Sequence, residues 1–223
     1  MNSFSLKMIA IITMLIDHTA AALISPEEPI YLIMRMIGRL AFPIFCFLIV
    51  EGFYHTKNVN KYMFRLGIFA IISEIPFDLA LFVDRNYFDH QNVYFSLLIG
   101  LAVIYALHKV SLLNLNNIMV SYILQFLIIF AGCALATIIK TDYSFMGVIL
   151  ILTFYLFHNK KGLLIISVLF VTIFLGGLFE GIASLSLIPI LLYNGKKGPS
   201  AKYVFYAFYP VHIFVLYLIS TII

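Results

Sequence analysis

The sequence predicts an all-α fold, a polytopic membrane helix bundle of about nine transmembrane helices that forms one domain over residues 1–223. Hydrophobic residues make up 63% of the chain and charged residues only 11%, whereas soluble domains carry about 25% charged residues. The apolar residues are grouped in runs close to the ~20 residues that cross a bilayer as a helix. Basic residues fall in the short connections between these runs, which is typical of a multi-pass membrane protein.

The expected helices follow the apolar runs in order. No polar stretch is long enough for a separate soluble domain, and the first run is expected to span the membrane rather than to act as a cleaved signal peptide. The three runs after residue 143 are shorter than a full span and are separated by turns at "HNKKG" and "LFEG", so tilted or partly inserted helices are expected there. The predicted runs are 6–24, 30–54, 61–83, 92–108, 117–139, 143–158, 162–178, 180–193 and 203–223.

The distribution of lysine and arginine predicts a cytoplasmic N-terminus and, with nine spans, an external C-terminus. We therefore expect a multi-pass membrane protein whose basic connections face the cytoplasm. The outer connections would hold only two basic residues, Arg85 and Lys140, together with the acids Glu27, Glu28, Asp84, Asp89 and Asp142. The inner connections would hold ten: Lys7, Lys57, Lys61, Arg65, Lys109, Lys160, Lys161, Lys196, Lys197 and Lys202.

Charged and polar residues also lie inside the apolar runs, where an ionised group is costly unless it is paired or functional. A rise of about 1.5 Å per residue places seven of them at one depth in the outer half of the membrane, with His212 near the middle of the last span. Pro76 is expected to kink or break its helix. The seven residues are Asp17, His18, Arg35, Arg39, Glu74, Asp78 and Asn92.

Helix geometry indicates how some of these side chains pair. Arg35 and Arg39 are four residues apart and therefore share one helix face. Asp17 and His18 are neighbours, so their side chains point about 100° apart. We therefore expect Asp17 to pair with an arginine and His18 to face a cavity.

Several interpretations of this cluster are open at this point. The charges could be buried ion pairs that only fix helix packing, as in a non-catalytic membrane subunit of a secretion or conjugation apparatus. They could also line the pathway of a small ion-coupled transporter, although no inverted repeat is evident. The six histidines are scattered without ligand spacing, so no metal is expected, and nothing indicates nucleic acid as a partner.

Five long stretches make a family resemblance visible, least clearly across residues 105 to 175. The chain closely resembles the TraX family in "LKMIAIITMLIDHTAA", "RMIGRLAFPIFCFLIVEGFYHTKNVNKYMFRL", "ISEIPFDLALF", "QNVYFSLLIG" and "YNGKKGPSAKYVFYAFYPVHIFVLYLI". TraX is known as the enzyme that N-acetylates conjugative pilin at its N-terminus. The family is distantly similar to the acyltransferase-3 enzymes and to heparan glucosaminide N-acetyltransferase, which carry acetyl groups from cytoplasmic acetyl-CoA to acceptors on the far side.

The resemblance implies a membrane acyltransferase with acetyl-CoA as co-substrate and an amine or hydroxyl acceptor, either a pilin-like N-terminus or an envelope glycan. Its catalytic residues would be His18, as general base or transient acetyl carrier, and Arg39 with Arg35, on the oxyanion or a CoA phosphate. Asp17 would orient the arginines. The acceptor would be bound by Glu74, Asp78, Asn92 and His212. The CoA phosphates would meet Lys57, Lys61, Arg65, Lys196 and Lys197. Membrane lipid is the other expected partner.

Overall fold

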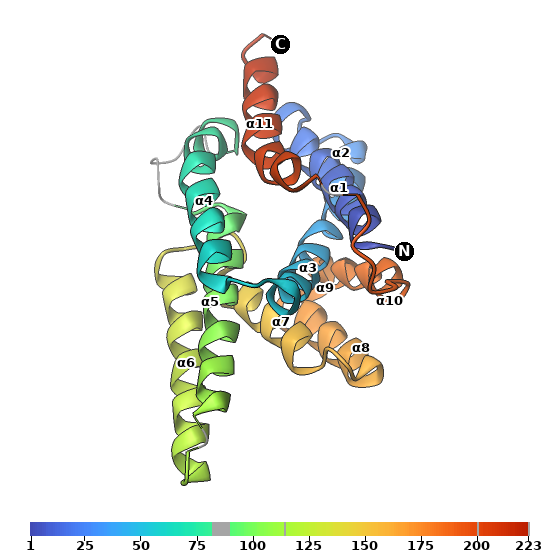
Figure 1. The fold of residues 1–223 in the computed structure, drawn as a ribbon. Coiled ribbons are helices and arrows are strands. Elements are labelled where there is room, and N and C mark those ends of the chain that lie inside the picture. The colour runs from blue at the N-terminus through green and yellow to red at the C-terminus, as the bar shows by residue number, and fades with distance from the viewer. Residues whose placement is uncertain (82–89, 114, 200, 223) are drawn as a thin grey trace.

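The computed structural model describes residues 1–81, 90–113, 115–199 and 201–222, and every regular element in these ranges is a helix (Figure 1). The predicted all-α fold is confirmed, and each of the nine predicted runs contains helix. Arg85, Asp84 and Asp89, which were assigned to an outer connection, lie outside the described residues. The elements are α1 (Ser3–Leu23), α2 (Pro29–Gly38), α3 (Ala41–His55), α4 (Val59–Leu81), α5 (Val93–Leu112), α6 (Ile118–Ile138), α7 (Ser144–Leu156), α8 (Lys161–Phe170), the π-helical η1 (Val171–Leu175), α9 (Gly177–Gly181), the 3-10 helix η2 (Ile182–Ser186), α10 (Leu187–Leu191) and α11 (Lys202–Ser220).

Five helical stretches in the described part of the chain are long and apolar enough to cross a membrane. They are α1, α2 with α3, α5, α6 and α11. Helix α4 has 23 residues but carries four charged side chains, and the three stretches after residue 143 have 10–17 residues each. These helices indicate a membrane protein, in which the last three stretches are as short as expected.

The predicted helix 30–54 is interrupted at Arg39 and Leu40, between α2 and α3. Pro43 explains the interruption, because it has no N–H to donate to the carbonyl of Arg39, four residues earlier. Pro76, in contrast, does not break its helix, since α4 is continuous through it. The predicted turn at "LFEG" is also wrong. All four residues belong to α9. The chain turns just before them, at Gly176 and Gly177, and Gly177 has φ +83°.

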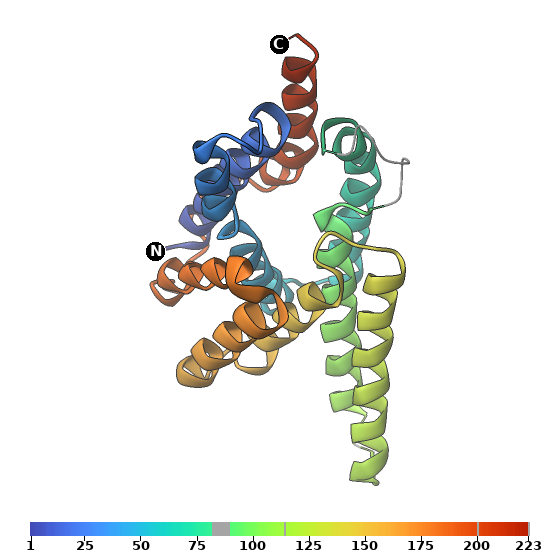
Figure 2. The ribbon, with the colours of Figure 1, turned by 180° about the vertical axis from the view of Figure 1, so that it is seen from behind.

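Two groups of helices face each other across the bundle. Figures 1 and 2 show α1 and α2 on one side and α4, α5 and α6 on the other. Helix α11 packs against both α1 and α4 and joins the groups, while α3 contacts α1, α5 and α7. Helices α5 and α6 project together beyond the other helices.

Proline and the N-terminus account for three tertiary hydrogen bonds that close this bundle. Pro210 leaves the carbonyl of Tyr206 without its helical donor, and the hydroxyl of Tyr94 donates to that carbonyl at 3.0 Å. At the other end, Ser3 N donates to Lys196 O at 2.8 Å, and Asn194 N donates to Met1 O at 2.8 Å. The start of α1 is thereby tied to the basic loop that precedes α11.

Helices α5 and α6 approach closely at Gly132, where an added Cβ would overlap a γ-methyl group of Val103. We expect Gly132→Ala to destabilise the protein by about 1–3 kcal/mol through overpacking. This exceeds the ~0.5–1 kcal/mol that alanine gains over glycine in a helix. The thermal midpoint of unfolding in detergent measures the effect. Gly162→Ala is the matched control, because a Cβ there meets nothing within 4 Å; equal midpoints for the two variants would contradict the prediction.

Candidate functional site

A cavity of about 280 Å³ lies where the C-terminal half of α1 meets α2, the start of α3 and the end of α4. We call it the charged cavity, because it is lined by Asp17, His18, Arg35, Arg39 and Asp142. Its other walls are apolar or aromatic: Met14, Ala21, Tyr31, Gly38, Ala41, Phe42, Phe45, Phe77, Leu81, Val93, Tyr143 and Tyr209.

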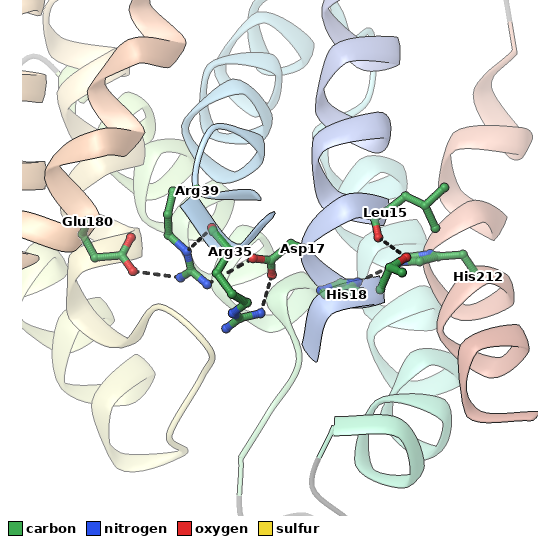
Figure 3. Close-up of polar contacts among 8 residues, drawn as sticks. Leu15, Asp17, His18, Arg35, Arg39, Glu180 and His212 are labelled. Carbon is green, nitrogen blue, oxygen red and sulfur yellow. Dashed lines mark hydrogen bonds and ion pairs between the residues drawn. The ribbon is translucent and has the colours of Figure 1, made fainter. Parts of the chain in front are cut away.

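Ion pairs link three elements on the wall of this cavity (Figure 3). The buried carboxylate of Asp17, on α1, accepts from Arg35 Nη1 at 2.8 Å and from Arg39 Nη2 at 3.4 Å. Arg39 Nη1 also donates to Glu180 Oε1 at 2.8 Å, so the chain of charges continues into α9. Two arginines and two carboxylates balance one another, and the predicted pairing of Asp17 with an arginine is confirmed.

Local structure explains why these groups can meet. A Cβ at Gly38 would overlap the Asp17 side chain, so glycine allows α2 to approach α1 at the level of the ion pair. Arg39 stands at the break between α2 and α3, and its Nε donates to Arg35 O at 3.4 Å. The ring of Phe179 covers the guanidinium of Arg39 at 5.5 Å, in cation–π geometry. The Arg39 head group is therefore held from four directions.

His18 and His212 form a second polar unit beside the ion pairs. His212 Nδ1 lies 2.6 Å from the carbonyl oxygen of Phe208, and since a carbonyl only accepts, this nitrogen carries a hydrogen. In the neutral imidazole Nε2 of His212 is then an acceptor, and His18 Nδ1, 2.8 Å away, is the donor. This assignment leaves His18 Nε2 with a free lone pair on a residue that lines the charged cavity.

The tyrosine and acid of the turn before α7 complete the cavity wall. Tyr143 stacks on Phe42 with a centroid distance of 3.5 Å, and the backbone N–H of Asp142 donates to Gln91 O at 2.8 Å. The flanking residues Lys140 and Ser144 have φ of 52° and 46°, in a region that non-glycine residues rarely adopt. Such strain is often found at functional sites.

None of the four residues predicted to bind the acceptor is part of the cavity lining. Asn92 caps α5 by accepting from Tyr94 N at 3.0 Å, and its amide donates to Ala70 O at 2.8 Å and to Glu74 Oε2. Its polar groups thus join α5 to α4. Asp78 is 2% exposed, and Glu74, Asp78, Asn92 and His212 are all absent from the lining.

A second cavity, of about 480 Å³, lies at the opposite end of the bundle, near the start of α1 and α4. We call it the basic cavity, because Lys7, Arg65, Lys197 and Lys202 line it. Of the residues predicted to meet CoA phosphates, Arg65 and Lys197 line this cavity, while Lys57, Lys61 and Lys196 do not. Tyrosines add a flat apolar wall, and Arg65 lies 5.7 Å from the ring of Tyr62. Phe45 lines both cavities.

One acid faces the basic cavity. Glu51 accepts from His158 Nε2 at 2.5 Å and has His55 Nδ1 at 4.0 Å. The hydrogen bond to Glu51 raises the pKa of His158. Glu51 is thus hydrogen-bonded to His158, while the lysines and the arginine give this cavity an excess of basic groups.

Sequence reasoning overlooked three parts of the two sites. Glu180 is the one charged residue between Lys161 and Lys196, and a lone acid in an apolar stretch is the same signal that singled out Asp17. Asp142 and Tyr143 carried no comparable signal, because Asp142 was assigned to an outer connection and Tyr143 to the start of the run 143–158. The contact between His18 and His212, 194 residues apart, was not predicted either.

The fold and the site define the class of protein: an all-helical membrane protein with an ion-pair cluster and a histidine on one cavity. The chain belongs to the TraX family, since the family model "TraX protein" matches residues 3–220. It is 32% identical over 239 residues to "Probable fimbrial assembly protein FimC, serogroup H1" of Dichelobacter nodosus, covering 96% of this chain and 94% of that protein. It is 35% identical over 100 residues to an uncharacterized protein of Rickettsia prowazekii (strain Madrid E), covering 45% of this chain and 35% of that protein. No solved structure matches.

The double ion pair of Asp17 leads to a stability prediction. Asp17→Asn removes the ion-pair partner that two partly buried arginines share and leaves Arg39 its ion pair to Glu180. Removing one member of a buried ion pair costs up to about 3–5 kcal/mol. We expect a clear fall in the thermal midpoint in detergent. Glu27→Gln removes an exposed carboxylate and is expected to leave the midpoint unchanged; a similar fall in both variants would contradict the prediction.

Proposed function

We propose that this protein is a membrane-embedded acetyltransferase that transfers the acetyl group of acetyl-CoA to an amine or hydroxyl acceptor. The observation that carries the proposal is the placement of His18 and Arg39 on one cavity that shares the Phe45 wall with a basic cavity. A base, a cation for the oxyanion and a basic entrance for the nucleotide are the three elements that acyl transfer from CoA requires.

The transfer to an amine can be written with each group in place. The amine nitrogen attacks the thioester carbonyl and forms the N–C bond, while His18 Nε2 takes the proton that the nitrogen loses. Arg39 stabilises the negative charge that develops on the carbonyl oxygen. The C–S bond then breaks, the thiolate takes the proton from His18, and the products are the acetylated amine and the free thiol of CoA.

His18 could also act as a nucleophile with the same free nitrogen. Nε2 would attack the thioester first, the C–S bond would break, and CoA would leave as the thiolate. The acceptor amine would then attack the acetyl group on His18, the bond from Nε2 to the acetyl carbon would break, and the proton that the amine loses would go to the thiolate. Both routes need His18 and the same tautomer. His212 acts in either route as a positioning residue, because its hydrogen bond holds the proton on His18 Nδ1.

We further propose that the basic cavity opens to the cytoplasm and holds the phosphates of CoA. Lysines and arginines of membrane proteins concentrate on the cytoplasmic side, so this end and the N-terminus would be inside, in a multi-pass arrangement in the bacterial inner membrane. The pantetheine arm is long enough to cross about half of a ~30 Å hydrocarbon core. It would therefore reach from the basic cavity to the charged cavity.

The comparisons favour a pilin-like acceptor. The relative from Dichelobacter nodosus is described as a probable fimbrial assembly protein, and it matches this chain over nearly its whole length. A free N-terminal amine of a pilin-like protein, presented at the outer half of the membrane, is thus the acceptor we propose first, with an envelope glycan as the alternative.

The central prediction concerns His18 and Arg39. With radiolabelled acetyl-CoA and a peptide bearing a free N-terminal amine, purified wild type is expected to form labelled peptide. His18→Ala and Arg39→Ala are each expected to lower kcat about 100-fold or more, because general-base and oxyanion groups contribute at least this much. His108→Ala, which lines neither cavity, is the control.

Folding of each variant is followed by its thermal midpoint. A wild type that neither binds nor turns over acetyl-CoA would overturn the proposal and favour an ion-coupled transporter or a non-catalytic subunit. A folded His18→Ala variant that keeps wild-type turnover would also overturn the proposal.

The role of the basic cavity is tested by comparing two donors. Arg65→Gln is expected to raise KM for acetyl-CoA about tenfold or more, since charge-assisted hydrogen bonds contribute about 1.5–3 kcal/mol, and to leave kcat nearly unchanged. KM for acetyl-pantetheine, which has no nucleotide phosphates, is expected to stay constant. Lys57→Gln is the control, because Lys57 does not line the cavity. Equal effects of Arg65→Gln on both donors would exclude phosphate binding at this position.

A further inference from the structure

Phe45 is the side chain that the linings of the two cavities share among the described residues, and helix α3 supplies wall residues on either side of it. Ala41 and Phe42, one turn before Phe45, line the charged cavity, while Leu48 and Ile49, one turn after it, line the basic cavity. Both cavities therefore lie along one face of α3 and meet at this ring.

The burial pattern of α3 agrees with this position. All residues from Ala41 to Val50 are buried except Phe45, which is partly exposed. A partly exposed aromatic residue within this otherwise buried stretch needs an open space beside it, and the two cavities provide it. Only part of the ring is packed into the core, so its free surface faces the cavities.

The two spaces that meet at Phe45 both have charged groups on their walls. The ion pairs of Asp17 and the imidazole of His18 lie on one side, and the cations of the basic cavity lie on the other. An apolar ring between them opposes the passage of water and ions, while an acyl thioester, which carries no charge, can lie against it at little cost. The ring also occupies the space that a longer acyl chain would need.

We propose that Phe45 is the specificity-determining barrier between the two cavities. It limits the transferred group to a short acyl chain and separates the charged cavity from the water of the basic cavity. The inference rests on the proposed acyltransferase function and adds the residue that selects the donor. It assigns Phe45 no role in proton transfer or in charge stabilisation.

The experiment compares acyl donors of increasing length. Acetyl-, propionyl- and butyryl-CoA, each labelled in the acyl group, are given to wild type, Phe45→Ala, Phe45→Leu and Phe53→Ala, with the same amine peptide as acceptor. The readouts are kcat/KM for each donor and the rate of hydrolysis without acceptor. Phe53 is the control, since it is a buried phenylalanine of α3 that packs on Tyr105 and Tyr155 and lines neither cavity.

Wild type is expected to prefer acetyl-CoA. One methylene group in an apolar pocket changes kcat/KM by about 10–200-fold, so Phe45→Ala is expected to raise the butyryl to acetyl ratio at least about tenfold and to increase hydrolysis. Phe45→Leu is expected to fall between wild type and Phe45→Ala, and Phe53→Ala to keep the wild-type ratio at a lower thermal midpoint.

The outcomes distinguish a failure of the inference about Phe45 from a failure of the proposed acyltransferase function on which it rests. If wild type transfers acetyl groups and a folded Phe45→Ala variant keeps the wild-type ratio, Phe45 is not the barrier, while the acyltransferase function stands. If wild type turns over none of the three donors, the proposed function fails and the inference fails with it. If Phe45→Ala does not fold, the ratio in Phe45→Leu decides, since an unchanged ratio there also overturns the inference.

Discussion

The carboxylate of Asp17 holds two arginines inside an apolar bundle, and the geometry of the site follows from this constraint. An unpaired buried charge costs several kcal/mol, so each arginine must have a carboxylate within reach. Asp17 on α1 therefore pairs with both Arg35 of α2 and Arg39, which lies between α2 and α3. Gly38 makes this approach sterically feasible, and Glu180 balances the second arginine.

Helix α3 connects this charged cluster to the basic end of the molecule. The helix break at Arg39 turns a guanidinium toward the cavity, and Pro43 explains the break through a missing N–H donor. From there α3 carries the walls of both cavities, with Phe45 between them. In the proposed reaction, the charged cavity would hold the acceptor and the basic cavity the donor, and placing both on one rigid helix would favour accurate positioning of a thioester.

Several features of the site could be predicted from the sequence and others could not. The apolar runs and the four-residue spacing of Arg35 and Arg39 were sufficient to predict the helices and the pairing of Asp17, because both depend on local periodicity. The predicted depth of Glu74 and Asn92 in the membrane was a weaker guide to whether they line the cavity. Depth says nothing about the direction of a side chain, and these two residues point toward each other between α4 and α5. Pro76 shows a similar limit, since packing keeps α4 continuous through it.

The sequence by itself determined the membrane class, the all-helical architecture, the basic end of the bundle and the presence of buried charges that need partners. These properties follow from composition and from the 3.6-residue period, which are local. The tertiary structure alone decided that Glu180 meets Arg39, that His212 meets His18 and that Phe45 lines two cavities. Each of these contacts joins residues brought together by helix packing, and packing depends on the shapes of all side chains at once rather than on any single stretch of sequence.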